Sequence, residues 1–175
     1  MKKLFLLLLL IGETGQAAIT RTSVENLKMQ KRFGMGLSVG GPLATLGFEI
    51  DMNFMPEFSI SGGVGTGLDY STFMVKARYF LPGEWVSPYF AAGFARWWSN
   101  GTRETDLSPA VLKKTFLGGQ SSYERGFSVF LVYPAIGVQV MHSTGLSFFA
   151  EAQYLFQLMN FANGTYAGCG VHWYF

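Results

Sequence analysis

The chain has 175 residues, of which 17% are aromatic and only 14% are charged, and its 22 glycines are many for this length. The mean hydropathy of +0.24 excludes an intrinsically disordered chain, and a formal net charge of +2 gives no electrostatic basis for binding nucleic acid. The single cysteine, Cys169, excludes an internal disulfide framework, and the length predicts one domain.

The first 17 residues have the features of a secretory signal peptide. Lys2 and Lys3 are followed by an apolar run over residues 4–11 and by small residues at Ala17 and Ala18. The apolar run is too short to cross a bilayer as a helix. We therefore expect residues 1–17 to be removed on export, with cleavage after Ala17 or, alternatively, after Ala18.

Residues 18–32 are polar and only weakly periodic. We expect them to form a solvated periplasmic segment ahead of the first strand. Basic residues gather at the end of this segment, at Lys28, Lys31 and Arg32. Contact of this basic cluster with phospholipid head groups is the alternative interpretation.

From residue 33 onward, apolar residues recur with period 2, which predicts β-strands. The alternation is clearest where Phe48 and Ile50 flank Glu49 and precede Asp51. Strands are predicted over residues 33–40, 44–54, 58–67, 72–81, 86–98, 127–141, 145–157 and 165–175. Turn signals at 55–57, 82–85 and 142–144 separate several of them. These lengths suit an outer membrane, so residues 33–175 are predicted to form an all-β, eight-stranded antiparallel up-and-down transmembrane barrel.

An even number of strands puts both chain ends on one side of the barrel, which we expect to be the periplasmic side. The tight turns lie on that side, and the long polar segment 99–126 lies on the other. Ser108 and Pro109 predict the start of a short helix within this segment. We expect any external partner to bind loop 99–126, and a loop that only closes the barrel is the alternative.

The charged residues of the predicted strands fall mainly on the face opposite the large apolar side chains. They are Glu49, Asp51, Lys76, Arg78, Arg96 and Glu151. A soluble barrel would spread many more charges over its polar face, so this face is interpreted as a narrow lumen. Charges are tolerated there only when they are paired, which predicts an ion-pair network that fills the interior. The register of residues 86–98 stays open because both of their faces are apolar.

The last strand carries Val171, Trp173 and Phe175 on one face. This pattern resembles the closing strand of bacterial outer-membrane barrels, whose assembly machinery recognises a terminal aromatic residue preceded by apolar residues at alternate positions. Aromatic residues also suggest a belt at each membrane interface. The expected members are Tyr79, Trp85, Trp173, Tyr174 and Phe175 at the end near the termini and Tyr70, Trp97 and Trp98 at the other.

Residues 87–93 (SPYFAAG) and 151–154 (EAQY) are similar to strands common in small outer-membrane barrels. Over residues 33–175 the chain resembles the OmpA/OmpX/OmpW-like superfamily of eight-stranded barrels. This resemblance implies an integral protein of a Gram-negative outer membrane. It also implies membrane lipids and lipopolysaccharide as surroundings, and the barrel-assembly machinery as a partner during biogenesis.

Three functions are compatible with such a barrel: a structural or surface-interaction role, a narrow conduit for small or hydrophobic solutes, and modification of lipid A. We expect the first of these. Lipid A deacylases of this architecture use a His-x-Ser pair with a nearby Glu. Here His142 and Ser143 are adjacent and precede Glu151 by several positions, so the spacing departs from that motif. Metal-ligand spacing and phosphate-binding glycine loops are also missing from the sequence. No catalytic, cofactor or metal site is therefore expected.

Overall fold

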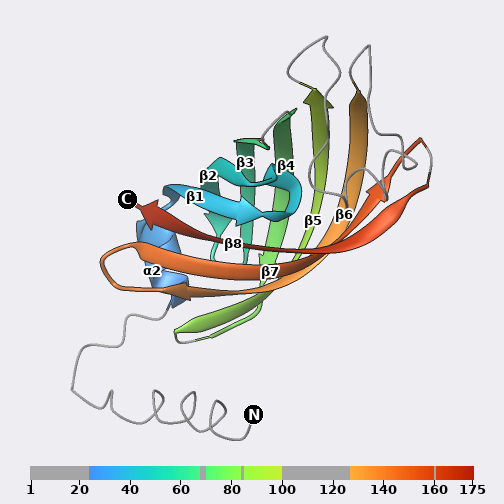
Figure 1. Ribbon diagram of the computed structural model, residues 1–175. Helices are drawn as coiled ribbons and strands as arrows, with labels where there is room; N and C mark the ends of the chain where they lie inside the picture. Colours follow the sequence, from blue (N-terminus) through green and yellow to red (C-terminus); the bar gives the residue numbers. More distant parts are fainter. Residues whose placement is uncertain (1–23, 68–69, 84, 100–126, 160) are drawn as a thin grey trace, which may run out of the picture.

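The computed structural model describes residues 24–67, 70–83, 85–99, 127–159 and 161–175. Eight strands form a closed barrel in which each strand is antiparallel to its neighbours and β1 pairs with β8 (Figure 1). Their bounds are β1 Phe33–Gly40, β2 Leu46–Met55, β3 Phe58–Thr66, β4 Tyr70–Phe80, β5 Val86–Ser99, β6 Ser128–Met141, β7 Leu146–Gln157 and β8 Asn163–Tyr174. The predicted all-β, eight-stranded up-and-down barrel is confirmed.

Period 2 in the sequence decides which side chains enter the barrel. In β2, Phe48 and Ile50 are exposed, whereas Glu49 and Asp51 between and after them are buried. Successive side chains of a strand point to opposite faces, so the apolar set lies outside and the polar set inside. The barrel therefore has charged side chains in its interior and apolar side chains on its outer surface.

The connection between β1 and β2 folds into the barrel as the 3-10 turn η1, Gly41–Leu43, all of whose residues are buried. Leu43 joins the interior cluster that includes Tyr70 and Trp97. The indole N–H of Trp97 donates to the carbonyl oxygen of Pro42 at 2.7 Å. Ala44 has a positive φ of 65°, which breaks the extended backbone. The expectation that the second strand starts at residue 44 is therefore wrong, and β2 starts at Leu46.

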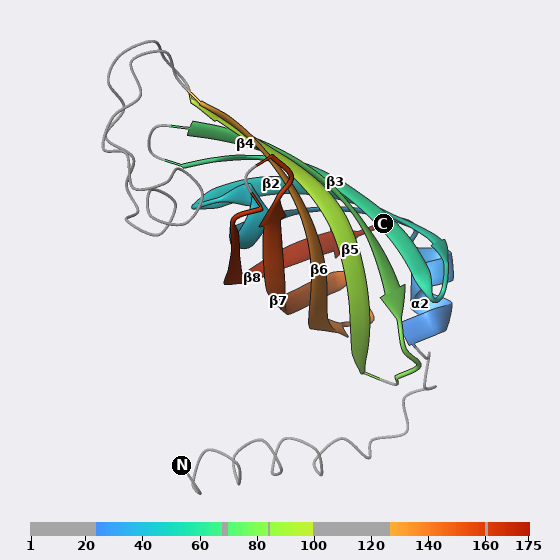
Figure 2. The ribbon, with the colours of Figure 1, turned by 90° about the vertical axis from the view of Figure 1, so that its right-hand side faces the viewer.

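A helix that the sequence did not predict, α2 Val24–Gln30, lies at the end of the barrel that holds the C terminus (Figure 2). Leu27 is buried in a cluster with Met141 and Tyr174. Lys28 is 1% exposed, and its Nζ atom lies over the ring of Phe80. The prediction that residues 18–32 are solvated is therefore wrong for Leu27 and Lys28, because each of them has a contact inside the barrel mouth.

Two predictions fall outside the described residues. They are the signal peptide over residues 1–17 and the helix that begins at Ser108 and Pro109 in loop 99–126. In the described ranges, no helix is long and apolar enough to span a membrane.

Candidate functional site

The strand β3 explains how acidic residues on β2 reach basic residues on β4. Antiparallel pairing places Asp51 opposite Ser61 on β3, and Ser61 opposite Lys76 on β4. The inward-facing residues of β3 are small, namely Ser59, Ser61, Gly63 and Gly65. Because Ser59 and Ser61 have short side chains, longer side chains from β2 and β4 can meet across this part of β3, whereas Leu43 of η1 packs over Gly63 and Gly65.

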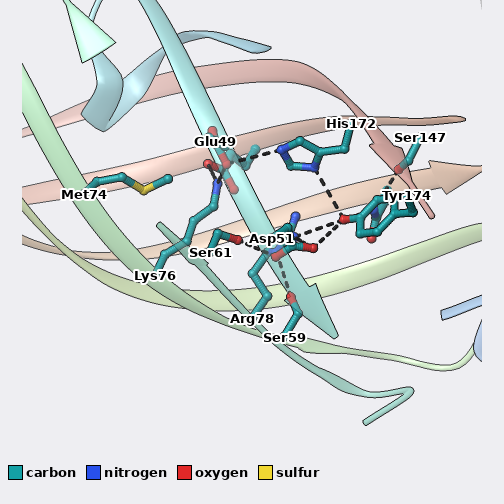
Figure 3. Close-up of polar contacts among 12 residues, drawn as sticks. Glu49, Asp51, Ser59, Ser61, Met74, Lys76, Arg78, Ser147, His172 and Tyr174 are labelled. Carbon is teal, nitrogen blue, oxygen red and sulfur yellow. Dashed lines mark hydrogen bonds and ion pairs between the residues drawn. The ribbon is translucent and has the colours of Figure 1, made fainter. Parts of the chain in front are cut away.

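Asp51 accepts bonds from three buried partners (Figure 3). Its Oδ2 atom pairs with Nη2 of Arg78 at 2.5 Å and also accepts the hydroxyl of Tyr174. The Oδ1 atom accepts the hydroxyl of Ser61 at 2.7 Å. Arg78 in turn donates from Nε to the hydroxyl oxygen of Ser59 at 3.1 Å. Charge pairing and hydrogen bonds together compensate this carboxylate for its removal from water.

Lys76 lies between two carboxylates. Its Nζ atom is 2.9 Å from Oε1 of Glu151 and 3.4 Å from Oε2 of Glu49. Glu151 also accepts the hydroxyl of Tyr89 at 2.8 Å and the Nε2 amide of Gln153 at 2.6 Å. Glu151 is therefore the better satisfied of the two acids, and it links β4, β5 and β7 through the interior.

His172 on β8 contacts residues from both sets: Glu49, which lies beside Lys76, and Tyr174, which is bonded to Asp51 (Figure 3). Its Nε2 atom is 3.5 Å from Oε2 of Glu49, and its Nδ1 atom is 3.4 Å from the hydroxyl of Tyr174. The ring stacks on Phe149 at 4.9 Å between centroids. The sequence analysis did not identify the contact between His172 and Glu49, because the two residues are far apart in the chain.

Five of the six residues expected in the lumen charge network lie together, and Arg96 does not. Arg96 is exposed on the outer face of β5, because its neighbours Ala95 and Trp97 are both buried inside. The expectation that Arg96 joins the lumen is therefore wrong. No sequence signal separated the two apolar faces of this strand, and the bond from Trp97 to Pro42 reveals the register only in the folded barrel.

The aromatic belts are also smaller than expected. Tyr70, Trp97 and Tyr174 are buried inside the barrel rather than at its surface. Of the residues expected in the belt near the chain termini, Tyr79, Trp85, Trp173 and Phe175 are exposed. Trp173 and Phe175, two residues of the expected assembly signal, therefore face outward, and Val171 on the same face is partly buried.

The outer wall of the barrel is apolar on every strand. Its exposed side chains include Leu37, Ile50, Ile60, Val75, Phe90, Ile136, Phe148 and Trp173. Among the described strand residues that face outward, Arg96 is the one charged side chain. An apolar band of this kind is suited to hydrocarbon, whereas in water it would be an aggregation-prone surface.

The residues compared with the deacylase motif do not meet. His142 and Ser143 are exposed in the turn between β6 and β7, where His142 contacts Thr144 through Nδ1 at 3.0 Å. Glu151 lies inside the barrel and is bonded to Lys76. Across the described ranges, no cluster of His, Cys, Asp and Glu has the arrangement of a metal site.

Comparisons with known proteins identify a fold. Neither a protein-family model nor a curated protein matches this sequence. The N-terminal β-barrel domain of Pseudomonas aeruginosa OprF is similar at a TM-score of 0.61 and 14% identity, over 83% of this chain and 98% of that domain. The Yersinia pestis outer-membrane protein Ail matches at a TM-score of 0.43 and 13% identity, over 83% of this chain and 99% of Ail. At 14% identity, the likeness to the OprF domain establishes a shared fold alone.

Proposed function

We propose that this chain, which has the fold of the small eight-stranded outer-membrane barrels, is an integral outer-membrane protein with a structural or surface-interaction role. The observation that carries this proposal is the combination of an apolar outer wall with an interior whose charges are paired to one another. A barrel of this kind is stable in hydrocarbon because all its backbone groups are paired within the closed sheet.

The buried side chains of the lumen support a plugged interior rather than an open pore. Lys76 and Arg78, both at most 1% exposed, cross the middle of the barrel. Leu43 of η1 is buried at one end, and Leu27 and Lys28 of α2 are buried at the other. Eight strands enclose little more than the volume of their own side chains, so three successive layers of buried side chains support a plugged interior.

The termini are proposed to lie in the periplasm, where α2 covers the barrel mouth. Val171, Trp173 and Phe175 then form the signal read by the barrel-assembly machinery, and the wall contacts membrane lipids and lipopolysaccharide. A partner outside the cell binds through loop 99–126, which is the longest connection. Catalysis is not part of the proposal because His142 and Glu151 lie in separate surroundings.

Membrane fractionation and conductance test this function. The mature chain is expected in the outer-membrane fraction, with different gel mobility before and after heating, and reconstituted barrels are expected to leave planar bilayers non-conducting. Replacement of residues 102–123 by a short Gly/Ser linker is expected to preserve the barrel and abolish binding of any surface partner. Recovery as a soluble periplasmic protein would contradict the proposal.

A narrow conduit is the second candidate, and polar atoms in the interior favour it. Thr72 Oγ1, Gln153 Oε1 and Gln157 Oε1 are buried without a hydrogen-bond partner among the described residues. Buried polar groups are normally paired with protein or ordered water, so these atoms favour a hydrated region of the lumen. Conductance that appears when residues 18–30 are deleted would support a conduit covered by α2.

A further inference from the structure

Arg96 lies on the apolar outer wall of the barrel, where an unpaired charge is unfavourable. Its cross-strand neighbours on β4 and β6 are Phe73 and Phe130, and the surrounding wall is apolar. A charged side chain on a lipid-facing wall is costly unless it reaches the interface and finds a partner. Arg96 lies three residues before the end of β5, at the rim that carries loop 99–126.

The contacts of Arg96 orient its guanidinium group without neutralising it. Its Nε atom donates to the hydroxyl oxygen of Ser128 at 3.2 Å. Its Cζ atom lies 5.1 Å from the ring centroid of Phe130 and 5.8 Å from that of Trp98. In the part of the chain that the structure describes, no carboxylate forms an ion pair with Arg96 and no acceptor binds its two Nη groups.

We propose that Arg96, Ser128 and Trp98 form an anion site on the outer wall, which binds a phosphate group of lipid A in the outer leaflet. The inference rests on the proposed membrane location and on the proposed orientation of the barrel. The planar fork of Arg matches phosphate oxygens in geometry and charge. Ser128 and the two aromatic rings fix the side chain, while an indole at Trp98 is suited to the boundary between head groups and hydrocarbon.

The test uses the refolded barrel in nanodiscs of phosphatidylcholine, to which bisphosphorylated lipid A is added in increasing proportion. Side-chain NMR signals of Arg96 Nε–Hε and of the Trp98 indole N–H are expected to shift and to saturate together. The indole of Trp97 is the internal control, because it faces the lumen and is bonded to Pro42. Its signal is expected to stay in place.

Variants and other anions separate the possible ligands. Arg96→Gln is expected to weaken lipid A binding by about tenfold or more, and Arg96→Lys to restore part of it, because lysine keeps the charge without the fork. Lipid A without phosphates and inorganic phosphate at equal concentration are expected to cause no saturating shift. Saturation by inorganic phosphate alone would overturn the lipid assignment, as would binding that survives in Arg96→Gln.

The same experiment distinguishes failure of this site from failure of the proposed function. A chain that is not a membrane barrel would not insert into nanodiscs or change its gel mobility on heating, whatever lipid is present. An inserted, heat-modifiable barrel whose Arg96 and Trp98 signals ignore lipid A would overturn the anion site and leave the membrane location intact.

Discussion

Asp51 and Arg78 form an ion pair in which neither side chain has solvent-exposed surface, although their strands β2 and β4 are separated by β3. The pair also binds Tyr174 on β8 through Asp51. Through Asp51, these contacts therefore join β2 and β4 to the closing strand β8. Because both groups are fully desolvated, each depends on the other to offset the cost of burial.

Removal of one member of this pair is expected to destabilise the barrel more than removal of both. Asp51→Ala should lower the free energy of unfolding by about 3–5 kcal/mol, because the Arg78 charge stays buried without its main partner. The double variant Asp51→Ala, Arg78→Ala should recover part of that loss. Urea unfolding in lipid vesicles measures the coupling, and strictly additive losses would argue against a strong buried pair.

The two glutamates beside Lys76 are expected to differ in importance. Glu151→Gln should cost about 2–4 kcal/mol, because it weakens bonds from Lys76, Tyr89 and Gln153 at once. Glu49→Gln should cost less, since Oε2 of Glu49 is 3.4 Å from Lys76 and has no hydrogen bond. Matched unfolding curves test the order, and a larger loss for Glu49→Gln would contradict it.

The two histidines provide a matched comparison between the lumen and the surface. His172→Gln is expected to lower stability by about 1–3 kcal/mol, because it removes the stack on Phe149 and the contacts with Glu49 and Tyr174. His142→Gln should change stability by less than about 0.5 kcal/mol, because this side chain is exposed in a turn. Equal unfolding midpoints for the two variants would mean that the position of His172 does not stabilise the barrel.

Two glycines on β3 test how η1 is seated. A Cβ atom at Gly65 would collide with the backbone carbonyl of Leu43, whereas one at Gly62 would meet only the carbonyl oxygen of Met74, at 4.0 Å. Gly65→Ala should therefore displace η1 and destabilise the barrel, and Gly62→Ala should be nearly neutral. The indole NMR signal of Trp97, bonded to Pro42, reports the displacement directly. An unchanged signal in Gly65→Ala would contradict the seating described for Leu43.

Phe175 is expected to matter more for assembly in cells than for stability. Its backbone N–H donates to the carbonyl oxygen of Phe33 at 2.8 Å, and the residue is 57% exposed. Phe175→Ala keeps the backbone bond, so refolding of the purified chain should be close to normal. The amount of heat-modifiable protein in the outer membrane should fall several-fold if the ring is a recognition signal. Equal losses in cells and in refolding would instead indicate a purely structural contact.

Local alternation was enough to predict the strands and, on most of them, the inward face. The bounds of β1 agree with the prediction, and Glu49, Asp51, Lys76 and Arg78 lie inside as expected. The errors occur where alternation is absent. Both faces of β5 are apolar, so Arg96 was misplaced, and a turn rather than a strand occupies the positions up to Ala44.

Helix α2 had a weak signal that was not used. Ser23 precedes Val24 in the sequence, and Lys28 is in the last turn of the helix, which are features of helix ends. A helix of seven residues has little stability of its own. Packing of Leu27 against Met141 and Tyr174 stabilises it, and these contacts exist only in the closed barrel.

Local alternation was sufficient to identify the strands, most of the polar lining and the apolar wall, because period 2 is a property of the extended backbone. Which polar side chains meet depends on how the strands are arranged in the closed barrel. Closure of the sheet brings Tyr174 to Asp51 across 123 positions of sequence, and the inward path of η1 brings Pro42 to Trp97. These contacts depend on strand register and on the tilt of a closed barrel, which no single strand encodes.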